Sequence, residues 1–75
     1  MRDVEIEISD SPVLYINTHK SEIVIQDEQI ERIKRIDGVK IVAEYGTYGM
    51  ELWVLLDSEE YIDSIILEIK NCLNC

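Results

Sequence analysis

The chain has 75 residues, which suffices for one domain over residues 1–75 and leaves that domain a thin hydrophobic core. Its composition, with 47% hydrophobic and 31% charged residues and no low-complexity segment, excludes a disordered chain. The formal net charge of −9 argues against direct contact with nucleic acid or with an anionic membrane, and no apolar stretch reaches the roughly 20 residues of a membrane span.

The N-terminal residues predict a hairpin of two strands. Between positions 3 and 8, acidic side chains alternate with Val4, Ile6 and Ile8, which is the pattern of a strand with one buried face. Its acidic outer face suits the edge of a sheet, because carboxylates discourage pairing with another chain. Residues 10–12, Asp-Ser-Pro, are typical of a turn, and the apolar run 13–16 predicts the second strand.

The next segment, residues 22–25, admits two interpretations. Its β-branched residues favour a third strand, whereas Ser21 could cap a helix that begins early and continues. We favour the strand. A helix follows from Asp27, a good N-cap, because isoleucines recur at positions 30, 33 and 36 and Gly38 stands where a left-handed C-cap belongs.

The C-terminal half predicts a second hairpin and a second helix. Two apolar alternating runs, 39–45 and 50–56, flank a short segment with glycines that can take positive φ. Asp57 or Ser58 then caps the last helix, with carboxylates in its first turn. The apolar stripe of this helix consists of Ile62, Ile65, Ile66, Ile69 and either Cys72 or Leu73.

This order of elements predicts an α+β fold, a two-layer sandwich in which two helices cover one face of a mainly antiparallel sheet. The stretch from Ile30 to Leu73 resembles the middle of ferredoxin-like small domains of the ACT and heavy-metal-associated families, in which a helix ending near Gly-Val leads to a hairpin and a second helix. The resemblance implies a fold and no chemistry, because residues 16–28 lack the Cys-x-x-Cys of the metal-binding family. The last strand of that fold is also missing, and an N-terminal strand such as 4–8 could occupy the empty edge.

Few residues suggest chemistry. Cys72 and Cys75 have the spacing of metal ligands or of a redox pair, but one such pair without a nearby histidine is more typical of a structural role, with Cys72 on the apolar stripe. His19, the only histidine, lies in a polar segment that shows neither an orienting carboxylate nor a nucleophile, so we predict a surface residue. We expect no cofactor, no resident metal and no enzymatic activity.

Two further sequence patterns are better explained by a structural role than by binding or catalysis. The Gly-x-x-Gly of residues 46–49 joins two strands beside acidic residues, whereas phosphate and RNA loops have basic flanks or lead into a helix. Tyr45 and Tyr48 could present an aromatic contact at this turn. The carboxylates between Asp57 and Asp63 suit a capped helix with a solvated face and lack the pattern of a calcium loop.

The most informative feature is the strand 50–56, because both of its faces are partly apolar. Trp53 and Leu55 lie on the face opposite Leu52. If the helices cover the face of Leu52, then Trp53, Leu55 and Val42 form an apolar patch on the open side of the sheet, and such patches mark contact surfaces. Alternatively, the early strands fold over this patch and bury it.

These features lead to three hypotheses. The first is a small interaction or regulatory module that self-associates, as a homodimer or a larger homo-oligomer, through the sheet face around Trp53. We expect it to be cytoplasmic, because the N-terminus lacks the apolar region of a secretory signal. The second is an acidic decoy that occupies the nucleic-acid-binding surface of a partner protein, which would need its carboxylates on one continuous face. The third is a metal or redox accessory protein that uses Cys72 and Cys75.

Overall fold

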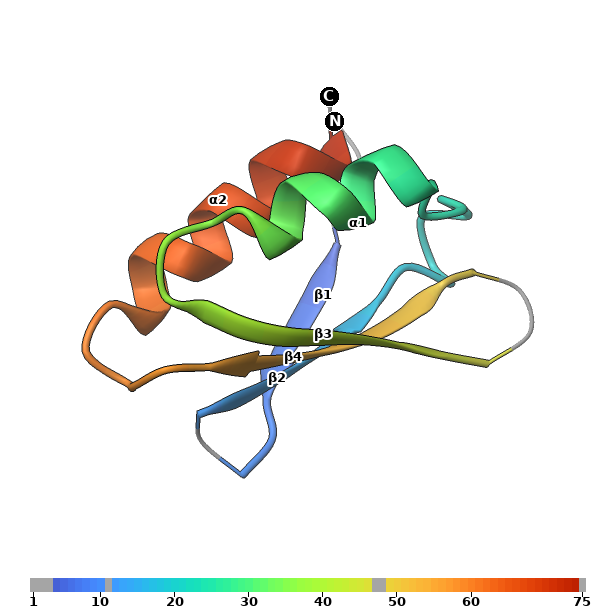
Figure 1. Ribbon diagram of the computed structural model, residues 1–75. Coiled ribbons are helices and arrows are strands. Elements are labelled where there is room, and N and C mark those ends of the chain that lie inside the picture. Colours follow the sequence, from blue (N-terminus) through green and yellow to red (C-terminus); the bar gives the residue numbers. More distant parts are fainter. Residues whose placement is uncertain (1–3, 11, 47–48, 75) are drawn as a thin grey trace.

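The structure, a computed structural model, describes residues 4–10, 12–46 and 49–74, which form one antiparallel sheet covered on one side by two helices (Figure 1). The strand order within these ranges is β1-β2-β4-β3. In chain order the elements are β1 (Glu5–Ile8), β2 (Val13–Asn17), α1 (Asp27–Lys34), β3 (Val39–Tyr45), β4 (Glu51–Leu56) and α2 (Ile62–Asn74). The α+β class and the two-layer arrangement predicted from the sequence are confirmed.

β1 occupies one edge of the sheet beside β2. The two strands form the predicted N-terminal hairpin, with Ile6 opposite Ile16. β2 in turn pairs with β4, where Leu14 lies opposite Val54, so that β2 and β4 join the N-terminal hairpin to the β3–β4 hairpin. β1 therefore lies at the edge of the sheet beside β2, and the arrangement is compatible with the ferredoxin-like variant with an N-terminal strand that the sequence led us to expect.

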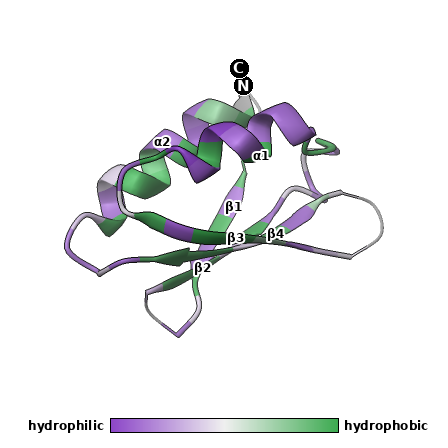
Figure 2. Cartoon of the chain, viewed as in Figure 1, coloured by the Kyte–Doolittle hydropathy of each residue, from purple (hydrophilic) through white to green (hydrophobic). Residues whose placement is uncertain are grey.

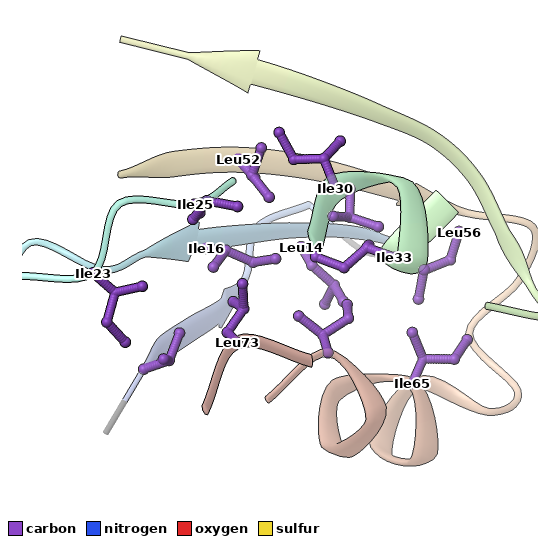
Figure 3. Close-up of a cluster of buried hydrophobic side chains, with 13 residues drawn as sticks. Leu14, Ile16, Ile23, Ile25, Ile30, Ile33, Leu52, Leu56, Ile65 and Leu73 are labelled. Carbon is purple, nitrogen blue, oxygen red and sulfur yellow. The ribbon is translucent and has the colours of Figure 1, made fainter. Parts of the chain in front are cut away.

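The hydrophobic core lies between the sheet and the two helices (Figure 3). Leu14 and Val54 of the sheet, Ile33 of α1 and Ile69 of α2 are 0% exposed. Full burial of one aliphatic side chain contributes about 1.5–3 kcal/mol, so the helices are held on the sheet by apolar packing. The buried apolar side chains are Val4, Leu14, Ile16, Ile23, Ile25, Ile30, Ile33, Leu52, Val54, Leu56, Ile65, Ile69 and Leu73.

The strand predicted for residues 22–25 is wrong. Glu22 has a φ of +54°, which breaks an extended run, and the residues after it form neither strand nor helix. Ile23 and Ile25 are nevertheless buried, because their backbone is tied to neighbouring segments. The Thr18 hydroxyl donates to the Ile23 carbonyl at 2.6 Å, and the Ile25 amide donates to the Gly49 carbonyl at 2.7 Å. The segment thus supplies apolar side chains to one end of the core.

The helix starts also differ from the prediction. Gln26, not Asp27, is the N-cap of α1, and its backbone amide donates to the Gln29 side chain at 2.8 Å. α2 begins at Ile62, several residues after the predicted caps. The Asp57 amide donates to the carbonyl of Gly38, just before β3, at 2.8 Å, so Asp57 continues the backbone pairing of β4 and does not cap the helix.

Gly38 has the left-handed backbone that the sequence predicted, with a φ of +99°. It follows the end of α1 and leads into β3. A Cβ atom at this position would lie 3.0 Å from Cδ1 of Ile65, so the glycine also permits a close approach between this turn and α2.

Candidate functional site: the open face of the sheet

Neither helix lies on the second face of the sheet (Figure 1), which we call the open face. Its members follow from the alternation along each strand, because the buried residues of β2 and β4 point to the helices and their neighbours point away. The strand registers then group the outward residues into three rows across the sheet. These rows are Glu5, Asn17, Glu51 and Tyr45; Glu7, Tyr15, Trp53 and Ala43; and Val13, Leu55 and Ile41.

One half of the open face is apolar. We define the apolar patch as Val13, Ile41, Ala43, Trp53 and Leu55, which come from three adjacent strands. Ile41 is 53% exposed, and Trp53 and Leu55 are half-buried. Figure 2 shows the hydrophobic stretches of these strands in green. A contiguous apolar surface of this kind is typical of a protein contact site.

The structure corrects the predicted position of Val42. Val42 lies opposite Val54 and packs against the core on the helix-covered face, so it does not join Trp53 and Leu55. The cause is an irregularity of the β3 register between Val39 and Ile41, which places an extra residue in the strand. Strict alternation had put Ile41 on the face of Val39, whereas the bulge turns Ile41 to the open face in place of Val42.

The early strands do not cover the patch. β2 pairs edge to edge with β4, and β1 lies beyond β2, so both extend the sheet sideways. The alternative, in which they fold over Trp53 and bury it, is therefore wrong. Their contribution is Tyr15, whose ring centre lies 4.7 Å from that of Trp53 with the rings inclined by 41°. Aromatic pairs at this distance attract each other beyond the area they bury.

A polar cluster adjoins this aromatic pair. The Tyr15 hydroxyl donates to Oε1 of Glu51, and Nδ2 of Asn17 donates to the Tyr15 oxygen at 3.4 Å. Nε2 of His19 lies 3.6 Å from Oε2 of Glu51. The hydrogen bond to Glu51 raises the pKa of Tyr15 above its ordinary value, because the neutral phenol is the donor, and desolvation acts in the same direction. The cluster therefore fixes the Tyr15 ring against Trp53.

His19 is an exposed turn residue, as predicted, and the carboxylate of Glu51 lies near it, which its neighbours in sequence did not suggest. Glu51 comes from β4, and only the pairing of β2 with β4 brings it near. Sequence reasoning also missed Tyr15 and Ile41. The alternation of Tyr15 with buried apolar residues indicates which face its side chain occupies. Its position opposite Trp53 could not be predicted from the sequence, because it depends on which strands pair.

Among the described residues, the other candidate side chains do not come together to form a metal or redox site. Cys72 is half-buried on α2 against the core, as predicted, and Cys75 lies outside the described residues. Among the described side chains, no group of three or more His, Cys, Asp or Glu residues could hold a metal ion. Gly46 and Gly49 take positive φ at the predicted turn, and Tyr48 lies outside the described residues.

Acidic side chains are spread over both layers of the fold. Their ion pairs are solvent-accessible, as in the 2.8 Å contact of Lys20 with Glu5, and exposed pairs of this kind contribute little to stability. The carboxylates between Asp57 and Asp63 are exposed, as predicted. Representative exposed carboxylates on the strands and helices are Glu5, Glu7, Glu44, Glu28, Glu31, Asp63 and Glu68.

Across residues 4–10, 12–46 and 49–74, the structure contains no helix with the length and hydropathy required to cross a membrane. Comparison of the chain with models of protein families, with curated proteins and with solved structures gives no match.

Proposed function

We propose that this chain is a small acidic interaction module that acts through protein–protein contact and self-associates through the apolar patch of its open face. The observation that carries the proposal is the position of Trp53 near the centre of a sheet face that neither helix covers. Tryptophan is enriched among the residues that dominate protein interfaces. A second copy of the same patch is the simplest surface that could cover it, through a two-fold axis.

The small size of the domain supports self-association. A chain of 75 residues buries only about 60% of the surface that it exposes when unfolded, so an additional buried face is a substantial gain. In a symmetric contact, Trp53 of each copy would meet Leu55 and Ile41 of the other. Burial of one large apolar side chain is worth about 1.5–3 kcal/mol, and two copies contribute it twice.

The charge distribution favours this proposal over an acidic decoy. A decoy requires carboxylates on one continuous face that matches a basic surface. Here the carboxylates occur on β1, on β3 and on the outer sides of both helices. A soluble rim around an apolar contact needs only such a dispersed arrangement.

The test is the substitution Trp53→Glu, with Leu67→Glu as the matched control. Leu67 is 60% exposed on α2, so the control adds the same charge to an exposed apolar position away from the open face. We expect Trp53→Glu to weaken self-association by at least about tenfold while circular dichroism shows a folded chain, because the core is untouched. Sedimentation equilibrium measures the association.

A Trp53→Glu variant that associates like the native chain would refute the proposal. So would a native chain that sediments as an 8.7 kDa species at every micromolar concentration. Equal weakening by Leu67→Glu would assign the effect to net charge and count against the apolar patch.

A further inference from the structure

The outer edge of β3 is the longer of the two free edges of the sheet. Within the described ranges, the order β1-β2-β4-β3 leaves β1 and β3 with a neighbour on one side only. β1 has four residues with the exposed carboxylates of Glu5 and Glu7, whereas β3 has seven residues. An edge strand presents unpaired N–H and C=O groups to which another chain can add a strand. Without a local obstacle, strand addition would therefore be easiest at β3.

The ladder between β3 and β4 has one extra residue on the β3 side. Val39 lies opposite Leu56, and the next registered pair is Ile41 with Leu55. The two β4 residues are consecutive, whereas the two β3 residues have Lys40 between them. Lys40 is therefore the extra residue of a β-bulge, and no residue of the described β4 strand is registered opposite it.

The registered pairs on either side of the bulge do not depend on Lys40. If Lys40 were removed, Val39 and Ile41 would become neighbours, as their partners Leu56 and Leu55 already are. Both side chains would keep their faces, because Val39 packs against the core and Ile41 lies on the open face, as alternation along a regular strand requires. The bulge is therefore not required for the pairing of β3 with β4, and its consequences fall on the free edge.

We propose that the bulge at Lys40 closes the β3 edge to strand addition and so confines self-association to the apolar patch. A bulge bends its strand and increases the local twist, so a regular incoming strand cannot pair along the whole edge. The inference deepens the proposed function and rests on it for the contact that remains.

The lysine side chain strengthens this block. Lys40 is exposed, and it forms no ion pair with another described residue. An added strand would have to strip water from this ammonium group, and burial of an unpaired charge is costly. Charged residues on an edge strand, lysine above all, are a known protection against pairing with a second chain.

The block limits the size of the assembly. A two-fold contact through the apolar patch is closed, because each copy uses its own patch to cover that of the other. If the β3 edges also paired, each copy would have two separate contacts, and such a chain can build assemblies larger than a dimer, including open-ended ones. The bulged edge therefore stops assembly at the closed dimer.

The group that an added strand would bind follows from the ladder on the other side of β4. The Leu56 amide donates to the Pro12 carbonyl at 3.1 Å, so Leu56 and alternate residues before it direct their backbone groups to β2. Leu52 is one of these residues, and Glu44 lies opposite it. The Glu44 amide consequently points away from β4, toward the free edge.

Deletion of Lys40 tests the inference, and Lys40→Ala is the matched variant that removes the charge but keeps the extra residue. We expect the deletion variant to fold and to reach a weight-average mass at least about twice that of the native chain at the same concentration. Lys40→Ala should enlarge the assembly less, because the bulge remains. Adding Glu44→Pro to the deletion variant should restore the native mass, because proline lacks the N–H group and is tolerated on an edge strand. Sedimentation equilibrium measures these masses.

Amide hydrogen exchange of the native chain is a test that does not depend on the folding of a variant. The Glu44 amide should exchange rapidly at low concentration and equally rapidly where the native chain is associated, because the edge stays unpaired. Protection of this amide on association would overturn the inference. So would a folded deletion variant of native mass, or failure of Glu44→Pro to restore that mass.

The edge block and the face contact can fail separately. If deletion of Lys40 enlarges the assembly while Trp53→Glu has no effect on the native chain, the edge block stands and the face contact fails. If Trp53→Glu dissociates the native chain while deletion of Lys40 changes nothing, the face contact stands and the edge block fails.

Discussion

On β4, Leu52 and Leu55 are the same residue type three positions apart, yet Leu52 is 1% exposed and Leu55 is half-buried. Leu52 points to the helices, and Leu55 points to the open face. β4 supplies apolar side chains to both faces of the sheet. Because both helices pack on the same face, that face becomes the core and the other stays open. The comparison teaches that hydrophobicity alone does not distinguish a core position from a contact position in a two-layer fold.

The largest expected effect contrasts these two leucines. Leu52→Ala removes atoms from a packed layer and should lower the free energy of unfolding by about 2–5 kcal/mol, because a cavity remains. Leu55→Ala, measured at a concentration low enough to keep the chains apart, should cost about 1 kcal/mol or less. Urea denaturation of both variants measures the difference. Equal costs would show that the open face is packed as tightly as the core.

A smaller effect is expected at Gly38, in the turn between α1 and β3. Gly38→Ala should lower the free energy of unfolding by about 1–2 kcal/mol, because a left-handed backbone disfavours a Cβ. Contact with Ile65 adds to this cost. Thermal or urea denaturation in a double-mutant cycle with Ile65→Val, which lacks the contacting Cδ1 atom, separates the two causes. A Gly38→Ala variant of native stability would contradict the assignment.

The smallest effect concerns the polar cluster on the open face. The pKa of Tyr15 is raised on folding, chiefly by its hydrogen bond to Glu51, so this interaction stabilises the fold at pH below the unfolded pKa of 10.0. That stability is lost as the pH rises through the folded pKa. Native protein should therefore exceed Tyr15→Phe in stability near neutral pH, and the gap should close above about pH 10.

Urea midpoints of the native chain and Tyr15→Phe between about pH 8 and pH 11 measure this gap. Tyr61→Phe controls for the loss of a phenol, because Tyr61 is 65% exposed in the turn before α2. A gap that stays constant across this pH range would show that the Tyr15–Glu51 hydrogen bond does not contribute to stability.

Most of the fold was predictable from local patterns. Both hairpins, both helices and the apolar stripe of α2 follow from alternation, helical spacing and turn residues, and each is local in sequence. The bulge at Lys40 was not predictable, because one extra residue leaves the composition of β3 unchanged while it exchanges Val42 for Ile41 on the open face. The strand predicted for residues 22–25 was wrong because β-branched residues also occur in a buried segment without regular secondary structure.

The candidate site was predictable in part. Trp53 and Leu55 were assigned to the open face from alternation within one strand, and the structure places both there. The contact of Tyr15 with Glu51 joins residues 36 positions apart, so it depends on which hairpin edges meet. Local patterns do not carry that information, since either hairpin could pair through either of its edges.

The pairing of β2 with β4 affects the entropy cost of folding. Each hairpin closes a short loop, whereas the β2–β4 contact joins residues as far apart as Val13 and Leu55. Loop-closure entropy grows with chain separation, and non-local pairing slows folding for this reason. Pairing β2 with β4 therefore carries a larger loop-closure entropy cost than closing either hairpin. The same pairing brings together Tyr15 and Trp53, so the aromatic pair of the open face forms only when β2 joins β4.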